Sequence, residues 1–345
     1  QNGCRAFLVE HRVDLPADAV QIVTDDTRAA LAVIGADFYG NPADELHLIG
    51  ITGTKGKTTT ALSVLRLIAD PPGKIMGGEI WFEGEDMLQA KPARLREIRG
   101  SKISVIFQDP MTSLNPVYSV GDQIAEVIHQ HEKCSKEEGR RKAGDMLEMV
   151  GIPRARYDEY PHQFSGGMKQ RVVIAMSIAC SPELILADEP TTALDVTIQA
   201  QVLELMNELK EKLRTSLLLI THDLGVVAQV CDRVAIMYAG EIVESGTIAE
   251  VFDHPHHPYT IGLFGSIPSL DETAEKLKPI QGQMPDPTEL PEGCAFAPRC
   301  PYATGACRTR KPEMTGVGGT QMVRCLAHQG VFESPELMEE VRHGR

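Results

Sequence analysis

The sequence predicts an α/β fold built on a parallel β-sheet, and two observations support this prediction. Short apolar runs of strand length recur along the chain, at residues 46–52, 102–107, 184–187, 216–220 and 233–238. Continuous apolar runs are typical of parallel strands that are buried on both faces. Segments with helical periodicity separate these runs, and this alternation of strand and helix predicts a sheet covered by helices.

The first apolar strand leads into a glycine-containing loop, and the loop leads into a helix predicted from Thr58 to Ala69. A strand, a loop and a helix in this order are the context of a phosphate-binding loop, in which backbone N–H groups and the helix N-terminus face the phosphates. The nucleotide contacts predicted here are Gly53, Thr54, Lys55, Gly56, Lys57, Thr58 and Thr59.

The middle of the chain, from about residue 109 to 180, has a helical pattern. Residues 120–131 and 136–150 are amphipathic, so an inserted helical subdomain is predicted. Near its end Ser165, Gly166 and Gly167 precede the apolar helix predicted over 172–179. A small polar cap with two glycines leaves backbone N–H groups and the positive helix end facing an anion.

The apolar strand at residues 184–187 ends in two carboxylates, Asp188 and Glu189. At a strand end such a pair can hold Mg²⁺ and orient a water molecule. Residues 241–245 and 248–252 then close the predicted core.

Taken together and in this order, residues 165–171 and 184–190 resemble the signature loop and the Walker B motif of ATP-binding-cassette (ABC) ATPases. Three further motifs of that family have counterparts, with Gln108 as the Q-loop glutamine, Asp195 in the D-loop and His222 as the switch histidine. The resemblance implies an ATPase with ATP and Mg²⁺ as ligands. Its catalytic residues are then Glu189, His222 and Gln108, its Mg²⁺ ligands are Thr58, Gln108 and Asp188, and its further nucleotide contacts are Ser165, Gly166, Gly167 and Asp195.

Residues 61–328 resemble one branch of that family more narrowly, the ATP-binding subunits of oligopeptide and dipeptide permeases, a set that includes some nickel importers. The match is carried by residues 62–67, 77–80, 111–116, 254–260 and 293–301. It implies a bacterial protein at the cytoplasmic face of the membrane that hydrolyses ATP to power peptide import. The implied partners are a second ATPase subunit, two transmembrane permease subunits and, indirectly, an extracytoplasmic peptide-binding protein.

The first sixty residues resemble a different family. Residues 48–60 are similar to the ATP loop of Mur ligases, the peptidoglycan-precursor synthetases, especially UDP-N-acetylmuramyl-tripeptide synthetase, and residues 4–42 resemble the end of that family's first domain. The chain therefore resembles a fusion of two genes inside the phosphate loop. A biological fusion, an assembly artefact and a non-functional chimera all remain open.

The junction changes what is expected of nucleotide binding. In the template Gly-x₄-Gly-Lys-Thr, Ile51 stands where the first glycine belongs. The N-terminal antiparallel strands of an ABC ATPase are predicted to be truncated or replaced, and none of Phe7, Phe38 and Tyr39 lies in an adenine-stacking motif. We therefore expect the phosphate contacts to persist and adenine stacking to be missing.

Composition and length limit the alternatives. The 345 residues carry a net charge of −14, which argues against a nucleic-acid partner because phosphate backbones require a basic surface. No apolar run has the length of a membrane span, and Gln1 in place of an initiator Met suggests a fragment or an incomplete reading frame. The domains expected are a Mur-like fragment at 1–45, an ABC ATPase domain at 46–255 with its phosphate loop at 50–58, and a C-terminal extension at 256–345.

The extension contains four of the eight cysteines, Cys294, Cys300, Cys307 and Cys325. Their spacing is not that of a zinc ribbon, and a disulfide framework is not expected on the cytosolic side. The family resemblance implies an iron–sulfur cluster of the [4Fe–4S] type on these thiolates, and four structural thiols are the alternative. The histidines at 254, 256 and 257 are interrupted by prolines, which favours a rigid surface turn over a metal site.

Two other functions remain to be weighed against peptide import. A Mur ligase is disfavoured because the catalytic middle and C-terminal domains of that family are absent from the sequence. A non-transport ABC protein, for example in repair or translation, is disfavoured by the acidic charge and by the permease-like tail.

Overall fold

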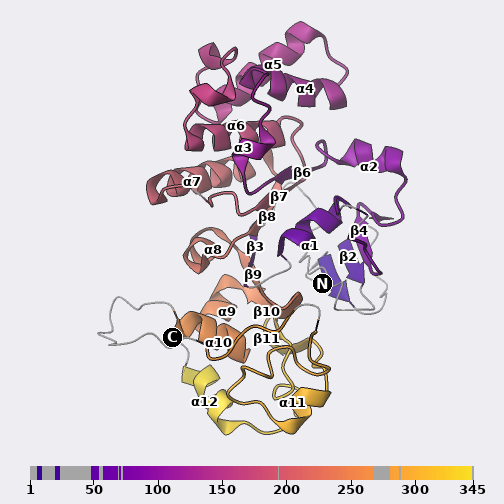
Figure 1. Ribbon diagram of the computed structural model, residues 1–345, viewed down its shortest axis with the longest axis vertical. Coiled ribbons are helices and arrows are strands. Elements are labelled where there is room, and N and C mark those ends of the chain that lie inside the picture. The colour runs from indigo at the N-terminus through magenta and orange to yellow at the C-terminus, as the bar shows by residue number, and fades with distance from the viewer. Residues whose placement is uncertain are drawn as a thin grey trace. The chain divides into compact units, whose positions relative to one another are not determined.

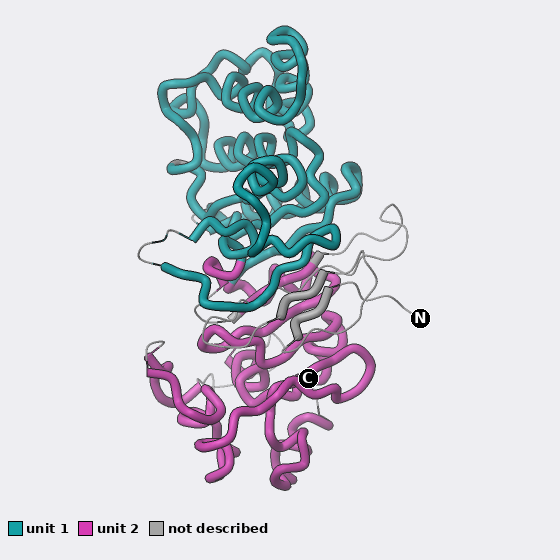
Figure 2. Tube along the Cα trace, turned by 90° about the vertical axis from the view of Figure 1, so that its right-hand side faces the viewer, with its two compact units in different colours: residues 1–25, 33–48, 61–221 teal, residues 26–32, 49–60, 222–345 magenta. Residues whose placement is uncertain are grey.

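The computed structural model describes residues 6–9, 20–23, 48–53, 57–68, 70, 73–192, 194–266, 280–286 and 289–343. The chain forms two compact units, which Figure 2 shows in different colours. Unit 1 comprises residues 1–25, 33–48 and 61–221, and unit 2 comprises residues 26–32, 49–60 and 222–345. Each unit is described by itself.

Three parallel strands form the centre of unit 1: β6 (Ile103–Ile106), β7 (Leu184–Asp188) and β8 (Ser216–Ile220). β7 lies between the other two, with Ile103 opposite Leu184 and Asp188 opposite Ile220. All five residues of β8 are buried. This burial explains why the strands are continuous apolar runs. Because the three strands are parallel, their carboxyl ends lie at one edge of the sheet.

Helices α3 (Pro110–Ser113), α4 (Val120–His131), α5 (Lys136–Met149) and α6 (Gly166–Ile178) form the helical subdomain, with short 3₁₀ turns at Arg154–Arg156 and Pro161–Gln163. In α4 the side chains of Val120, Ile124 and Ile128 are fully buried, the spacing of an amphipathic helix. α4 and α5 pack side by side (Figure 1), and both contact α6. α7 (Val196–Leu213) follows β7.

A second sheet in unit 1 has the strand order β1 (Ala6–Val9), β2 (Val20–Val23), β4 (Glu79–Phe82), β5 (Glu85–Asp86). β1 and β2 pair in parallel, and β2 pairs antiparallel with β4 through Ile22 opposite Ile80. The N-terminal segment therefore supplies strands to this sheet, so the expected antiparallel layer is replaced rather than missing. Residues 26–36, for which the sequence also predicts a helix, lie outside the described residues. α2 (Pro92–Ile98) follows β5.

Unit 2 contains residues 49–53 of β3 (Leu48–Gly53), which pair in parallel with β9 (Arg233–Tyr238). β10 (Glu241–Thr247), β12 (Gln321–Val323) and β11 (Thr315–Gly318) extend this sheet in antiparallel fashion. Two of these strands come from the predicted C-terminal extension, so the extension continues the sheet that leads into the phosphate loop.

The helices of unit 2 are α8 (Leu224–Val230), α9 (Ile248–Asp253), α10 (Pro258–Gly265), α11 (Gly305–Thr309) and α12 (Pro335–His343). Tyr238 of β9 packs on Tyr259 and Phe296, with ring centroids 4.7 and 5.1 Å apart. α1 (Lys57–Val64) follows the phosphate loop. No helix in the described part of the chain is both long enough and apolar enough to span a bilayer.

Candidate functional site

Two acidic residues end β7, as the sequence predicts. Asp188 is the last residue of the strand and is only 4% exposed. Glu189 follows it with a φ of 47°, a left-handed conformation that non-glycine residues rarely adopt. Its backbone N–H donates to the carbonyl of Ile220, 2.8 Å away at the end of β8. The neighbouring strand thus fixes the backbone from which the Glu189 carboxylate projects.

Gln108, which follows β6, contacts this carboxylate directly. Its Nε2 donates to Oε2 of Glu189 over 3.1 Å. The Oγ1 of Thr192 donates to the same oxygen over 3.0 Å. The sequence predicted Gln108 at the site but not Thr192, whose only signal is a hydroxyl three residues after the glutamate.

Ser165 caps α6, as predicted, because its side-chain oxygen accepts the N–H of Met168. The two glycines that follow differ in their surroundings. A Cβ at Gly166 would meet no atom closer than 3.9 Å, whereas a Cβ at Gly167 would lie 2.4 Å from Cγ2 of Ile198. The signature loop therefore packs against the first turn of α7.

Asp195 begins that first turn. Its side chain caps α7 by accepting the N–H of Ile198 over 3.0 Å. Ile198 therefore contacts both predicted segments: its side chain lies against Gly167 of the signature loop, and its N–H donates to Asp195 of the D-loop. Ala193, between Thr192 and Leu194, lies outside the described residues.

The phosphate loop and the switch histidine belong to unit 2. Gly53 ends β3 and Lys57 begins α1 with 9% of its surface exposed, while Thr58 and Thr59 are exposed. Thr54, Lys55 and Gly56 lie outside the described residues. His222 is exposed immediately before Asp223, which caps α8 through the N–H groups of residues 225 and 226. The predicted nucleotide residues are therefore distributed over both units.

The donor set of the predicted Mg²⁺ site fits that ion. Magnesium prefers oxygen ligands from one or two carboxylates, completed by water and substrate phosphates. Thr58 and Gln108 offer uncharged oxygens, and Asp188 offers a carboxylate at a buried strand end.

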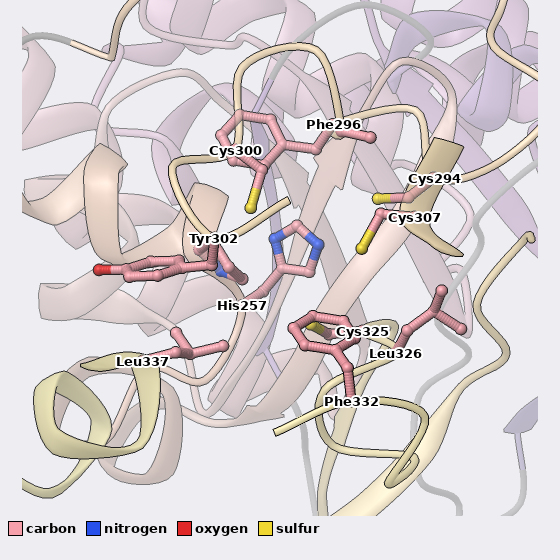
Figure 3. Close-up of a pocket in the computed structure, with 12 residues that line it drawn as sticks. His257, Cys294, Phe296, Cys300, Tyr302, Cys307, Cys325, Leu326, Phe332 and Leu337 are labelled. Carbon is pink, nitrogen blue, oxygen red and sulfur yellow. The ribbon is translucent and has the colours of Figure 1, made fainter. Parts of the chain in front are cut away.

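The four cysteines of the extension line one cavity in unit 2 (Figure 3). Apolar side chains, among them Phe296 and Leu326, complete its wall. Burial raises the pKa of Cys294 to about 11, that of Cys300 to about 12 and that of Cys325 above its usual value. Without a bound metal these thiols are therefore protonated. Their convergence could not be predicted from the spacing, because it depends on how α11, β11, β12 and the loops between them fold together.

The histidine-rich turn is not the surface turn that was predicted, because Pro255, His257 and Pro258 are buried. His257 is buried, lines the cysteine cavity and caps α10, with its Nδ1 accepting the N–H of Tyr259 over 3.0 Å. Burial lowers its pKa to about 3, so the ring is neutral. Across the described residues, no three His, Cys, Asp or Glu side chains lie close enough to hold a single metal ion.

Glu244 in β10 holds this turn in place. It is fully buried, and its carboxylate accepts the N–H groups of His256 and His257, 2.6 and 2.9 Å away, and the Nε2 of Gln321, 2.9 Å away. Burial raises its pKa to about 7 despite these donors. The carboxylate thus joins β10 to two segments of the extension.

Comparison with known families gives two matches along the chain. Residues 35–192 match the ABC transporter family, and residues 243–307 match the family described as "Oligopeptide/dipeptide transporter, C-terminal region". The first match includes β3 and the phosphate loop. The ABC transporter family therefore accounts for both segments without a second family.

Curated relatives match most of the chain. The oligopeptide transport ATP-binding protein OppD of Bacillus subtilis (strain 168) is 51% identical over 314 residues, covering 89% of this chain and 87% of the relative. The oligopeptide transport ATP-binding protein AppD of the same organism is 49% identical over 300 residues (86% and 91%), and its dipeptide transport ATP-binding protein DppD is 48% identical over 296 residues (85% and 88%).

Solved structures agree on the fold. The ATP-binding cassette MJ0796, a dimer bound to ADP and Pi, is 28% identical with a TM-score of 0.52, covering 59% of this chain and 85% of that one. The cbiO1 protein of Clostridium perfringens, part of the transporter complex cbiONQ, has the same identity and TM-score, covering 60% and 79%. The fold is an α/β P-loop ATPase fold of the ABC type with an inserted helical subdomain.

Proposed function

The chain belongs to the family of ATP-binding subunits of oligopeptide and dipeptide ABC transporters, and on this premise we propose that it hydrolyses ATP to power peptide import. The observation that carries the proposal is the contact between Gln108 and Glu189. It joins the residue proposed to sense nucleotide to the residue proposed to activate water, at the carboxyl end of a buried strand.

In this proposal Glu189 accepts a proton from the attacking water, because its carboxylate follows the buried Asp188 at the strand end. Lys57 contacts the β- and γ-phosphates, and His222 contacts the γ-phosphate. Bound Mg²⁺ neutralises charge on the phosphate oxygens. The residues that hold it are Thr58, Gln108 and Asp188.

The Glu189→Gln variant tests the catalytic assignment. General-base catalysis contributes roughly 10²- to 10⁴-fold, so turnover should fall by at least about a hundredfold while ATP binding persists. Glu204→Gln, on the exposed face of α7, is the matched control and should hydrolyse ATP like the parent. Parental turnover by the Glu189→Gln protein contradicts the assignment.

We further propose that two ATPase subunits pair so that the signature loop of one meets the ATP of the other. The open space at Gly166 and the capped N-terminus of α6 support this, because they leave N–H groups for an anion. With ATP bound, the Glu189→Gln protein should sediment as a dimer, with itself or with a second ATPase. Adding Ser165→Arg should abolish the dimer, and a dimer that survives this change contradicts the proposed arrangement.

Permease subunits are the proposed membrane partners. Large apolar side chains are exposed in unit 1 between β6 and α6: Phe107 (42%), Val117 (71%), Tyr118 (54%) and Tyr160 (42%). Large exposed apolar side chains that gather in one patch mark protein contacts, and we propose that these four form such a patch. Val117→Asp should prevent co-purification with the permease subunits and leave ATP hydrolysis by the free chain unchanged.

The proposed solute is a peptide, because the curated relatives are named for oligopeptide and dipeptide transport. Uptake of labelled dipeptide, oligopeptide and nickel by cells that contain the whole transporter distinguishes the three. Peptide uptake should stop in the Glu189→Gln strain. Uptake of nickel alone contradicts the peptide proposal.

We also propose a [4Fe–4S] cluster on Cys294, Cys300, Cys307 and Cys325. Their convergence on one cavity supports it, and the donor set suits iron–sulfur ligation once the thiols lose their protons. Anaerobic purification with iron and sulfide analysis tests this proposal. Zinc, or no metal, contradicts it.

The Mur-ligase origin of residues 1–60 stays a prediction. The ABC transporter match already includes residues 35–60, so only the resemblance of the sequence itself supports this origin. Mass spectrometry of the natural protein is the test, since a proteolytic peptide that crosses residues 50–62 establishes the fused chain. If flanking peptides appear without it, the fused chain is an artefact.

A further inference from the structure

Thr192 is bound to Glu189 at two points. Its backbone N–H donates to the Glu189 carbonyl over 3.1 Å, and its Oγ1 donates to the Glu189 carboxylate over 3.0 Å. The first bond closes a turn and the second reaches the proposed reacting group. Both residues lie in unit 1, in the described part of the chain.

The surroundings of Glu189 explain why the Thr192 hydroxyl can fix the orientation of its carboxylate. A glutamate side chain has three rotatable bonds, and its χ3 torsion is broad, so the backbone alone does not orient the carboxylate. The left-handed φ of Glu189 and its bond to Ile220 fix only the backbone. An ionised carboxylate accepts hydrogen bonds and donates none, so each donor restricts its rotation.

Two donors meet on Oε2, and they come from different places in the sequence. Gln108 lies 81 residues away on another segment, whereas Thr192 lies three residues away in the same turn. The Gln108 contact depends on how two segments are placed. The Thr192 contact is local and is retained wherever the turn is intact.

We infer that Thr192 is a positioning residue for ATP hydrolysis, whose hydroxyl orients the Glu189 carboxylate toward the attacking water. This inference rests on the proposed role of Glu189. Thr192 itself touches neither nucleotide nor water in this account, and it acts only through the glutamate.

The test replaces Thr192 with valine, which keeps the branched shape and removes the donor, and separately with serine, which keeps the donor. In the full-length chain the valine variant should lose about tenfold to a hundredfold in kcat, the scale expected when a catalytic group is misplaced. KM for ATP should be unchanged, because the nucleotide contacts remain. The serine variant should restore kcat, which a purely steric role does not explain.

Two controls separate this inference from the proposed function. Thr191→Val makes the same change one residue earlier, at a buried threonine with no hydrogen bond to Glu189 in the described structure, and should keep parental kcat. Thr192→Val added to Glu189→Gln should lower the residual turnover no further, because no carboxylate remains to orient. Thermal unfolding confirms that each variant is folded, and Thr192→Ala replaces the valine variant if that one is not.

The outcomes are distinct. If Glu189→Gln is inactive and Thr192→Val turns over like the parent, the positioning role is wrong and the function stands. If Thr192→Val and Thr192→Ser lose equal activity, the hydroxyl is not responsible and the inference is also wrong. If Glu189→Gln hydrolyses ATP at the parental rate, the proposed function of that residue fails instead.

Discussion

Gly167 is the position where a single methyl group best tests the packing of the signature loop. In Gly167→Ala the new Cβ lies 2.4 Å from Cγ2 of Ile198, closer than carbon atoms approach in folded proteins. In Gly166→Ala the nearest atom, of Leu194, is 3.9 Å away, which is ordinary contact. The two substitutions are chemically identical and adjacent, so they form a matched pair.

Comparing the two variants also isolates the free-energy cost of overpacking at Gly167. Both glycines occupy the first turn of α6, so both variants gain a similar helix propensity, at most about 1 kcal/mol each. The difference between them is the cost of overpacking, typically about 1–3 kcal/mol. Ile198 is β-branched and sits in a helix, where one side-chain rotamer is strongly preferred, so it cannot simply turn away.

Urea unfolding of the nucleotide-free protein measures this difference, because no ATP contact contributes. Gly167→Ala should unfold at a lower urea concentration than Gly166→Ala. Adding Ile198→Ala to Gly167→Ala should recover part of the lost stability, which appears as a favourable coupling free energy between the two sites. Equal midpoints for the two glycine variants, or no coupling with Ile198→Ala, refute the packing argument and leave nucleotide contact as the reason for Gly167.

Three further predictions concern other parts of the chain. Gly293→Ala places a Cβ 2.3 Å from the Cys307 carbonyl and should lower the iron content of anaerobically purified protein, whereas Gly305→Ala, with no atom within 4 Å, should not. Although burial opposes it, bonds from two threonines lower the pKa of Glu250 from its usual 4.5 to about 2. The stability advantage over Glu250→Gln should therefore be complete above pH 4.5 and disappear as the pH falls through 2 in acid-unfolding curves. Without adenine stacking, worth about 1–3 kcal/mol, calorimetry should find similar, weak binding of ATP and GTP. A chain with a permease N-terminus in place of residues 1–60 should prefer ATP, and equal ATP affinities of the two chains contradict this.

Much of the fold could be predicted from the sequence because local signals agree with the final packing. The strands at 216–220 and 233–238 and the helix at 120–131 have the predicted bounds. Apolar runs set the strands, and Ser119 caps the helix by accepting the N–H of Asp122. In these elements a single periodicity determines both the local conformation and the buried face.

Other features depend on an unusual backbone conformation or on contacts between distant segments, and no local sequence pattern contains either of these. The role of Thr192 follows from the left-handed backbone of Glu189, and the burial of His257 follows from its position beside the cysteine cavity. The pairing of β2 with β4 joins residues nearly sixty positions apart, Ile22 and Ile80. These features could be identified only from the three-dimensional structure.

The junction between β10 and the extension has a consequence for how such a protein is inherited. β10 shares its ladder with β9 on one side and β12 on the other, and its Glu244 carboxylate takes donors from the extension. A gene that lost the tail would produce a sheet with an uncovered edge and a carboxylate stripped of its donors. Loss of the tail should therefore destabilise the ATPase core itself, so we expect the two parts of the chain to be retained together.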